Sequence, residues 1–476
     1  MFKITSIQDQ NKIIRLSENE STTSNTFSVI TGKNACGKSS LLAKIVNSFI
    51  FEEKTERMDL AYSSVDKPQK VIAISTSRFD KFPTLNNAKN NTQFTNSYNY
   101  LGFGGKHNSP TDILSDGLLS IIKGISDNTK NTSKIGKVFN YLGFSQNISV
   151  SFEIKVNLGY LRTKEYNSYV KKYMKTYTSG FFGNEEIRDH VNFSKWFDQT
   201  FIEIYGAKNN DLKDHFSPIK KDTSPNPNQE RLSFLKYIED ANNFFGGKNF
   251  NIKFDLFNQN NLNKEHYEWL IYLMSKGGVK VKNLMLTGKN DKASFSFNQA
   301  SSGQQCIMTM MIGIAGAIED NSLICIDEPE ISLHPQWQLD FIKLLQETFS
   351  HYYGCHFLIA THSPQIVSGL ETNNAYICSL ERNELHDAIT TSKKSADYQL
   401  AEIFKSPGFK NEYLLRVLLS FLTNPIEFLE KSENGINEIE RIIKLKEYIS
   451  PSDSVFKLIC LAEKVVMEGK DVLNLK

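Results

Sequence analysis

A glycine-rich segment near the N-terminus constrains the fold of this chain more than any other feature. The segment Gly32–Ser39 follows an apolar stretch, Phe27–Thr31, and precedes apolar residues that recur at helical spacing from Leu41. A strand, a glycine loop and a helix in this order place backbone N–H groups around an anion at the helix N-terminus. The segment therefore predicts an α/β fold with a phosphate-binding loop.

The side chains of this loop suit a nucleoside triphosphate. In such a loop the lysine, here Lys38, neutralises the β- and γ-phosphates, and the hydroxyl of Ser39 ligates Mg²⁺. Because spacing and flanking elements agree, an accidental glycine turn is a poor explanation. We therefore expect ATP and Mg²⁺ as cofactors. The predicted nucleotide-binding residues of the loop are Gly32, Lys33, Asn34, Ala35, Cys36, Gly37, Lys38, Ser39 and Ser40.

A second group of candidate residues follows the apolar stretch 323–326. Two adjacent carboxylates, Asp327 and Glu328, stand at the end of this predicted strand. Alone, such a pair is often only a helix N-cap. Downstream of a phosphate loop, however, Asp327 suits the magnesium shell, and Glu328 can orient and deprotonate the water that attacks the γ-phosphate. The pair predicts the hydrolytic half of the same site.

A histidine ends the next predicted strand, Phe357–Ala360. His362 could contact the γ-phosphate there and act in catalysis. A single histidine is usually structural, but its position after the acidic strand favours the functional interpretation.

Composition excludes several other classes of protein. The 476 residues include 55 basic and 53 acidic side chains, so no overall field commits the chain to nucleic acid or to a membrane surface. No apolar stretch approaches the ~18 residues of a membrane helix, and the first 17 residues lack the apolar run of a signal peptide. We expect a cytoplasmic protein whose six scattered cysteines are free thiols.

The pattern along the chain predicts four regions. Residues 1–85 and 284–385 carry the strand rhythm of the two halves of a nucleotide-binding domain. Residues 86–283 lose this rhythm, and we expect a large, mainly helical insertion there. Residues 386–476 have helical periodicity and are expected to form a C-terminal region that docks partners.

The order of these motifs resembles that of the ABC ATPase fold. The resemblance adds a serine–glycine signature and a Leu-His-Pro step to the groups above, and it leaves the insertion and the tail unexplained. In that family the signature of one protomer closes over ATP bound to the phosphate loop of another. The resemblance therefore implies a head-to-tail homodimer with two sandwiched nucleotides. The signature residues that it implies are Ser301, Ser302, Gly303 and Gln304.

Finer features narrow the resemblance. Asn34, the run Asp327–Glu330 and the step Leu333–Pro335 are similar to the SMC, recombination-repair and OLD branch rather than to transporters. Four further segments resemble bacterial anti-phage ATPases of the Septu type, including those attached to retrons: 74–83, 98–102, 395–400 and 411–413. That resemblance implies a higher homo-oligomer working with a separate HNH nuclease, and contact with DNA or retron nucleic acid.

Three positions depart from the family pattern. Ala300 stands before the signature serine where leucine is favoured, and Ala35 replaces a common glycine in the loop. Both are small, so neither should block binding. No glutamine follows the strand Val71–Ser75, where the family places a magnesium and water contact; Ser77 or Asp80 are the alternatives. This departure bears on the rate of hydrolysis.

Two other functions remain open at this point. One is a repair-type ATPase that clamps duplex DNA, for which Lys171, Lys172 and Lys175 among neighbouring tyrosines could supply charge. The other is an OLD-like, ATP-dependent nuclease, but the tail after His362 holds no strand-borne Asp-x-Asp pair, so we expect no nuclease activity of the chain itself. The leading interpretation is an ATPase whose nucleotide state controls assembly and a partner nuclease.

Overall fold

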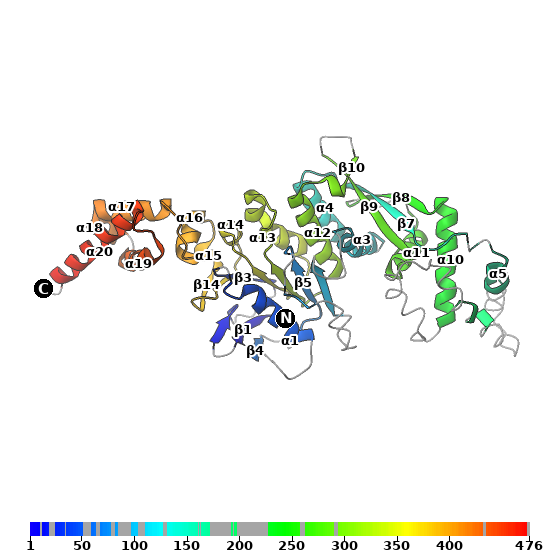
Figure 1. Ribbon diagram of the computed structural model, residues 1–476, viewed down its shortest axis with the longest axis horizontal. Coiled ribbons are helices and arrows are strands. Elements are labelled where there is room, and N and C mark those ends of the chain that lie inside the picture. The colour runs from blue at the N-terminus through cyan, green and yellow to red at the C-terminus, as the bar shows by residue number, and fades with distance from the viewer. Residues whose placement is uncertain are drawn as a thin grey trace. The chain divides into compact units, whose positions relative to one another are not determined.

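The structure is a computed structural model of the 476-residue chain (Figure 1). It describes residues 1–9, 12–18, 24–33, 35–50, 59–62, 67–77, 81–83, 97–102, 110–126, 131–159, 161, 163–171, 192–193, 195–197, 227–257, 262–289, 294–431 and 435–473. Among these residues, no helix has both the length and the apolar character needed to cross a membrane.

The chain divides into two compact units. Unit 1 combines Met1–Asn108 with Ile318–Lys476, and unit 2 is Ser109–Ala317. The division after residue 317 differs from the boundary expected after residue 283. The physical reason is strand pairing, because the segment just after residue 278 forms a strand of the sheet of unit 2.

A seven-stranded sheet forms the centre of unit 1. Its strand order is β14-β13-β3-β12-β11-β5-β6, and all neighbours are parallel except β13 and β14. The bounds are β3 Thr26–Thr31, β5 Val71–Ser75, β6 Tyr98–Gly102, β11 Leu323–Asp327, β12 His356–Ala360, β13 Ala375–Ser379 and β14 Glu384–Asp387. Strands β3, β5, β11, β12 and β13 are buried along their whole length, which explains their nearly continuous apolar sequences. The predicted α/β fold class is confirmed.

Smaller elements cover this sheet. A three-stranded antiparallel sheet has the order β2-β1-β4, with β1 Ile4–Asp9, β2 Lys12–Arg15 and β4 Asp59–Tyr62. Helix α1 is Lys38–Ile50; its apolar residues, including Leu42 and Ile45, lie in one core with residues of β1 and of the large sheet. Helices α13 (Pro335–Phe349) and α14 (Pro364–Ser368) follow β11 and β12. The helix N-termini after β3 and β12 therefore face the carboxyl edge of the sheet.

A buried histidine fastens the small sheet to the large one. The imidazole of His356 accepts the backbone N–H of Ile4 at Nδ1 (3.1 Å) and lies 2.9 Å from Ser28 Oγ through Nε2. The Ser28 hydroxyl in turn donates to the carbonyl of Leu16 (2.6 Å), so it accepts from His356 and the ring carries its proton on Nε2. Burial, with a smaller effect of Lys3, lowers the pKa of His356 to about 3.

Unit 2 contains a sheet as well as helices. The antiparallel order is β10-β9-β7-β8, with β7 Asn147–Ile154, β8 Asn249–Asp255, β9 Val279–Thr287 and β10 Ser294–Ser296. The main helices of its described part are α3 Pro110–Ser126, α4 Asn131–Tyr141, α10 Pro227–Phe245, α11 Lys264–Ser275 and α12 Ser302–Ala317. Helices α3 and α12 pack closely, since a Cβ on Gly117 would lie 2.5 Å from the Ile312 carbonyl oxygen. The expected insertion is thus not only helical, because β7 and β8 pair across it.

The C-terminal part of unit 1 is a helical module. It comprises α17 Glu412–Thr423, α18 Pro425–Lys431, α19 Gly435–Lys444, η6 Leu445–Tyr448 and α20 Ser454–Leu473, drawn in orange to red in Figure 1. Leu414, Leu418, Ile439 and Ile459 are fully buried in its own apolar core. The predicted helical tail is therefore present.

Two of the segments that resemble Septu ATPases meet where this module begins. The carboxylate of Asp397 accepts the first N–H of α17, from Glu412 (2.8 Å), and Asn411 donates to the Asp397 carbonyl (3.0 Å). The rings of Tyr398 and Tyr413 lie edge to face at 5.0 Å. These segments hold the module in place, and nothing in their geometry points to chemistry of their own.

Candidate functional site

The glycine loop has a backbone that only small residues can follow. A Cβ on Gly32 would lie 2.6 Å from Sγ of Cys36, and Gly37 has a φ of 100°. Ala35 has a φ of 63°, in the left-handed region, where a non-glycine residue costs about 1 kcal/mol. The departure from glycine at Ala35 is therefore compatible with the turn, at a modest cost.

Lys38 is the first residue of α1 and turns back over the loop. Its side chain is 4% exposed, and Nζ donates to the carbonyls of Gly32 (2.9 Å) and Lys33 (3.2 Å). Burial lowers the pKa of Lys38, while Cys36 and the nearby carboxylates oppose this. The ammonium is thus surrounded by acceptors at the place where α1 presents unpaired N–H groups. This arrangement suits an anion.

Ser39 and Asp327 bring two oxygen ligands together. The Ser39 hydroxyl donates to Asp327 Oδ1 at 3.0 Å, across the gap between α1 and the tip of β11. Oxygen is the ligand type that Mg²⁺ prefers, and this ion usually takes one or two protein groups and completes its shell with water and phosphate. The described residues hold no group of three or more His, Cys, Asp or Glu side chains placed to bind a metal ion together. The two residues fit Mg²⁺ in this mode.

The backbone of Glu328 is fixed by the neighbouring strands. Its N–H donates to the carbonyl of Ala360 at the end of β12 (2.9 Å), and its carbonyl accepts from the Thr76 hydroxyl just beyond β5 (2.7 Å). Its φ of 50° is left-handed, which turns the chain sharply at the strand tip. Thr76 therefore links the end of β5 to the end of β11. Thr76 was not identified from the sequence, although its position directly after a predicted strand was a signal for it.

His362 joins the two halves of the site. Its Nδ1 lies 3.3 Å from Lys38 Nζ, and its Nε2 lies 3.8 Å from Glu328 Oε1. Burial and the charge of Lys38 lower the pKa of His362, against the opposing effect of Glu328. An ammonium can only donate, so Nδ1 accepts and the neutral ring carries its proton on Nε2, facing the carboxylate.

A second carboxyl group lies behind His362. Glu330 Oε1 accepts the backbone N–H of His362 at 2.6 Å. Burial raises the pKa of Glu330, and hydrogen bonding, chiefly from this N–H, opposes the increase. Glu330 was predicted only as part of the resemblance of its motif, although its spacing after Glu328 is a signal that could have identified it.

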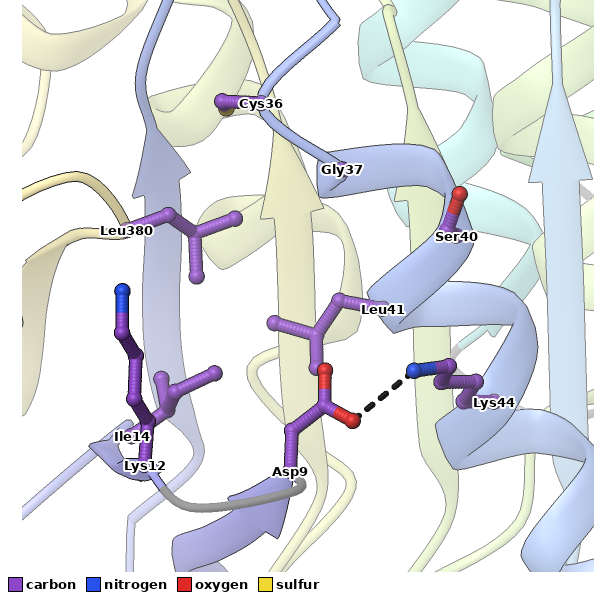
Figure 2. Close-up of a pocket in the computed structure, with 9 residues that line it drawn as sticks. All are labelled: Asp9, Lys12, Ile14, Cys36, Gly37, Ser40, Leu41, Lys44 and Leu380. Carbon is purple, nitrogen blue, oxygen red and sulfur yellow. Dashed lines mark hydrogen bonds and ion pairs between the residues drawn. The ribbon is translucent and has the colours of Figure 1, made fainter.

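A cavity of about 350 Å³ adjoins the loop (Figure 2). Figure 2 shows that one side comes from the loop and α1 and the other from the pair β1 and β2. Lys44 forms an ion pair with Asp9 at 2.8 Å across it. The lining residues are Asp9, Lys12, Ile14, Cys36, Gly37, Ser40, Leu41, Lys44 and Leu380. The cavity is mixed in character, with an apolar wall and charged groups at the rim.

The loop also contacts the segment after β13 and the C-terminal module. The Lys33 N–H donates to Glu381 Oε1 (2.9 Å), and Lys33 Nζ lies 4.9 Å from the ring centre of Tyr448 in η6. Neither partner was anticipated, because the sequence offers no pattern that relates residue 33 to residue 448.

The signature residues lie in unit 2. Ser301 and Gln304 form a reciprocal cap on α12: the Ser301 N–H donates to Gln304 Oε1 (3.0 Å), and the Gln304 N–H donates to Ser301 Oγ (3.3 Å). Gln304 Nε2 also donates to the Leu142 carbonyl (3.1 Å). Ser301 and Ser302 are exposed at this helix start, so they are available to another molecule.

The structure thus brings the candidate residues of unit 1 together. The contacts above link five of them: Lys38, Ser39, Asp327, Glu328 and His362. The roles of these residues stay predictions. Asn34 and Asp80 lie outside the described residues. So do the side chains proposed for duplex DNA, 171–177, although Tyr169 before them stacks on Trp196 at 5.6 Å.

Comparisons with known proteins agree with this geometry. A family described as "AAA ATPase domain" matches residues 8–367, which include both halves of the site. The chain is also similar to an Escherichia coli protein named "Retron Ec83 probable ATPase", with 28% identity over 104 residues. That similarity covers 20% of this chain and 18% of the relative, so the chain matches less than a fifth of the relative's length.

Proposed function

The chain belongs to the AAA ATPase domain family, and on that premise we propose that it binds ATP and Mg²⁺ between Gly32–Ser39 and the tips of β11 and β12, and hydrolyses ATP there. One observation carries the proposal. Lys38, His362 and Glu328 form a continuous chain of contacts across the strand tips, beside the converging oxygens of Ser39 and Asp327.

Each side chain has a distinct task in this mechanism. On nucleotide binding, Lys38 exchanges its loop carbonyls for phosphate oxygens, and the N–H groups at the start of α1 cover the β-phosphate. The Glu328 carboxylate accepts the proton of the attacking water. The Nε2–H of neutral His362 is available to donate to the γ-phosphate. Bound Mg²⁺ supplies Lewis-acid stabilisation of the phosphate charge, held by Ser39 and Asp327.

The cavity beside the loop is the proposed place for the nucleoside. It begins at Gly37 and Ser40, next to the proposed phosphate position, and its volume of about 350 Å³ is in the range of small-ligand sites. Leu41 and Ile14 offer apolar contact to a base, and Lys12 and Asp9 offer polar groups to a ribose.

The wider role is that of a nucleotide-controlled subunit in bacterial anti-phage defence. We propose that exposed Ser301 and Ser302, with Gly303 and Gln304, close over ATP bound to a second copy. The proposed output is control of a partner HNH nuclease within a larger homo-oligomer, in contact with retron nucleic acid. The name of the E. coli relative supports the retron link, and the segments around Asp397 and Asn411 support the Septu-type interpretation.

The test separates hydrolysis from assembly. Purified wild-type chain should release phosphate from ATP, and Glu328→Gln should bind ATP while turning over about 10²- to 10⁴-fold more slowly. Light scattering should show ATP-dependent association that is strongest in Glu328→Gln. Wild-type turnover in Glu328→Gln would refute the assigned base. Association unaffected by ATP would refute the sandwich and leave hydrolysis standing.

The defence role needs a separate test. The first observation needed is whether a small HNH protein is encoded beside this chain. The two are then co-expressed, and pull-down with and without ATP should show nucleotide-dependent association. Wild-type cells and Lys38→Ala cells are then compared for phage resistance. If resistance is unchanged by Lys38→Ala, the proposed control by nucleotide is wrong.

A further inference from the structure

We propose that Glu330 is a positioning residue for ATP hydrolysis, which holds His362 between Lys38 and Glu328 by accepting its backbone N–H. The inference rests on the hydrolysis proposed above for this site. It concerns a side chain that contacts the backbone of His362 and acts through this neighbour.

The turn after β11 is built to direct this carboxyl group at β12. The left-handed backbone of Glu328 (φ 50°) and of Ser332 (φ 69°) reverses the chain twice within five residues. Between these points the Leu333 N–H donates to the Glu330 carbonyl at 3.0 Å, which closes the turn. The side chain is thereby fixed at both ends, by its own backbone and by the 2.6 Å hydrogen bond from His362.

The residues on either side of His362 have anchors of their own, including the Thr361 N–H, which donates to the Ile30 carbonyl at 3.1 Å. After Ala360 the chain leaves β12 and enters the short helix α14 at Pro364. Ser363 is anchored by its hydroxyl, which donates to Gln338 Oε1 (2.6 Å), and by its N–H, which donates to Thr361 Oγ1 (2.9 Å). The backbone N–H of His362 itself donates to Glu330. A shift at this point would move the imidazole relative to Lys38.

The burial of Glu330 has a cost in folding stability. Oε2 of Glu330 is buried and has no hydrogen-bond partner among the described residues. A carboxyl group with unused, buried acceptor capacity destabilises the fold compared with a group that is satisfied. On this proposal the cost is offset by the hydrogen bond that the glutamate side chain makes with the N–H of His362.

A different role for Glu330 is electrostatic. Its charge is among those that favour the protonated form of Lys38, after Cys36 and Glu328. If this were its main role, ATP hydrolysis would depend on the charge of residue 330 and not on the length of its side chain. Two substitutions separate these cases: Glu330→Gln keeps the reach and an acceptor oxygen without the charge, and Glu330→Asp keeps the charge but is one methylene shorter.

The experiment measures steady-state ATP hydrolysis by the full-length chain. Glu330→Asp and Glu330→Ala should lower kcat by about 10- to 100-fold with little change in KM, because a misplaced group slows chemistry more than binding. Glu330→Gln should retain most of the wild-type kcat. Combining Glu330→Ala with His362→Ala should lower kcat no further than His362→Ala alone. The exposed Glu347→Ala on α13 serves as the matched control.

The outcomes are distinct. Loss of activity in Glu330→Gln with activity retained in Glu330→Asp would overturn the proposal in favour of the electrostatic role. Multiplying losses in the double variant would also overturn it, since they would show action independent of His362. Should Glu330→Ala fail to fold by thermal melting, the Gln and Asp variants decide. Slow turnover in Glu328→Gln with normal turnover in all Glu330 variants would leave the proposed hydrolysis standing and reject only this inference.

Discussion

Nδ1 of His362 lies 3.3 Å from Nζ of Lys38, so a strand tip near residue 360 and a loop near residue 38 share one hydrogen bond. Through Nε2 the same ring faces Glu328 at 3.8 Å. Removing the imidazole therefore affects Lys38 and Glu328 at once. This relationship makes the imidazole the most informative single side chain to change.

His362→Ala should lower kcat for ATP hydrolysis by about 10²-fold while the Kd for ATP changes little. The reason is that Lys38 keeps its loop carbonyls, whereas the contact to Glu328 is lost. Phosphate release at saturating ATP and binding of a fluorescent ATP analogue measure the two quantities. A large loss of affinity with unchanged kcat would contradict the assigned role.

Lys38→Ala should weaken ATP binding itself by about tenfold or more, which corresponds to ~1.4 kcal/mol. The loss follows from removing a buried cation that faces the proposed phosphate position. Titration with the same analogue checks it, and Lys343→Ala on the exposed side of α13 is the control. Equal affinity in Lys38→Ala and Lys343→Ala would rule out the phosphate-loop role.

Ser301→Arg should leave ATP binding to the monomer intact and abolish ATP-dependent association in a Glu328→Gln background. An arginine at this exposed helix start would occupy the space proposed for the nucleotide of a second copy. Ser301→Ala is the comparison variant, because it removes the hydroxyl and the helix cap, at about 1 kcal/mol, without adding bulk. Analytical ultracentrifugation with and without ATP distinguishes the variants, and association that survives Ser301→Arg would refute use of the signature between copies.

Stability should fall on acidification partly because of His356. Its pKa is about 3 in the folded protein, against an ordinary value of 6.5, so between these values the unfolded chain binds one more proton. The contribution is complete above about pH 6.5 and is lost by about 1.4 kcal/mol per pH unit below it. Urea unfolding at about pH 7 and about pH 5 should show a shallower decline for His356→Asn than for wild type. Identical declines would show that His356 does not titrate in this window.

Glu402→Ala should cost about 3–5 kcal/mol of unfolding free energy, because it leaves the ammonium of Lys405 buried without its carboxylate. The pair is 3.2 Å apart, and its side chains are 6% and 8% exposed. The double variant Glu402→Leu with Lys405→Met should recover much of this loss. Guanidinium unfolding measures all three proteins; a double variant as unstable as Glu402→Ala would argue against an uncompensated charge as the cause.

The sequence predicted the central sheet well because its strands are buried on both faces. Strands β3, β11 and β12 have continuous apolar sequences whose ends carry the polar residues, and both features can be read without tertiary information. The sheet of unit 2 was harder to predict. The alternating pattern of β7 was available in Ile148, Val150 and Phe152, but its partners β8 and β9 lie about a hundred residues further on.

The sequence predicted those site residues that belong to short local motifs. It did not predict contacts between residues that are far apart in the chain. Gly32–Ser39 and Asp327–Glu328 are read from spacing alone. Glu330 contacts His362 after a turn in which the backbone of Glu328 is left-handed. This backbone conformation could not be predicted from the sequence. The contact of Lys33 with Tyr448 likewise depends on how the C-terminal module docks.

The pairing of β3 determines when this protein can acquire its site during synthesis. Strand β3 and the loop after it are synthesised long before the neighbours of β3 in the sheet, β12 and β13, which begin at His356 and Ala375. At a translation rate of about 5–20 residues per second, β3 waits roughly 15–60 s for these partners. The apolar sequence Thr26–Thr31 is therefore exposed as a nascent segment throughout that interval, which makes it the natural point for chaperone binding and for aggregation of truncated chains.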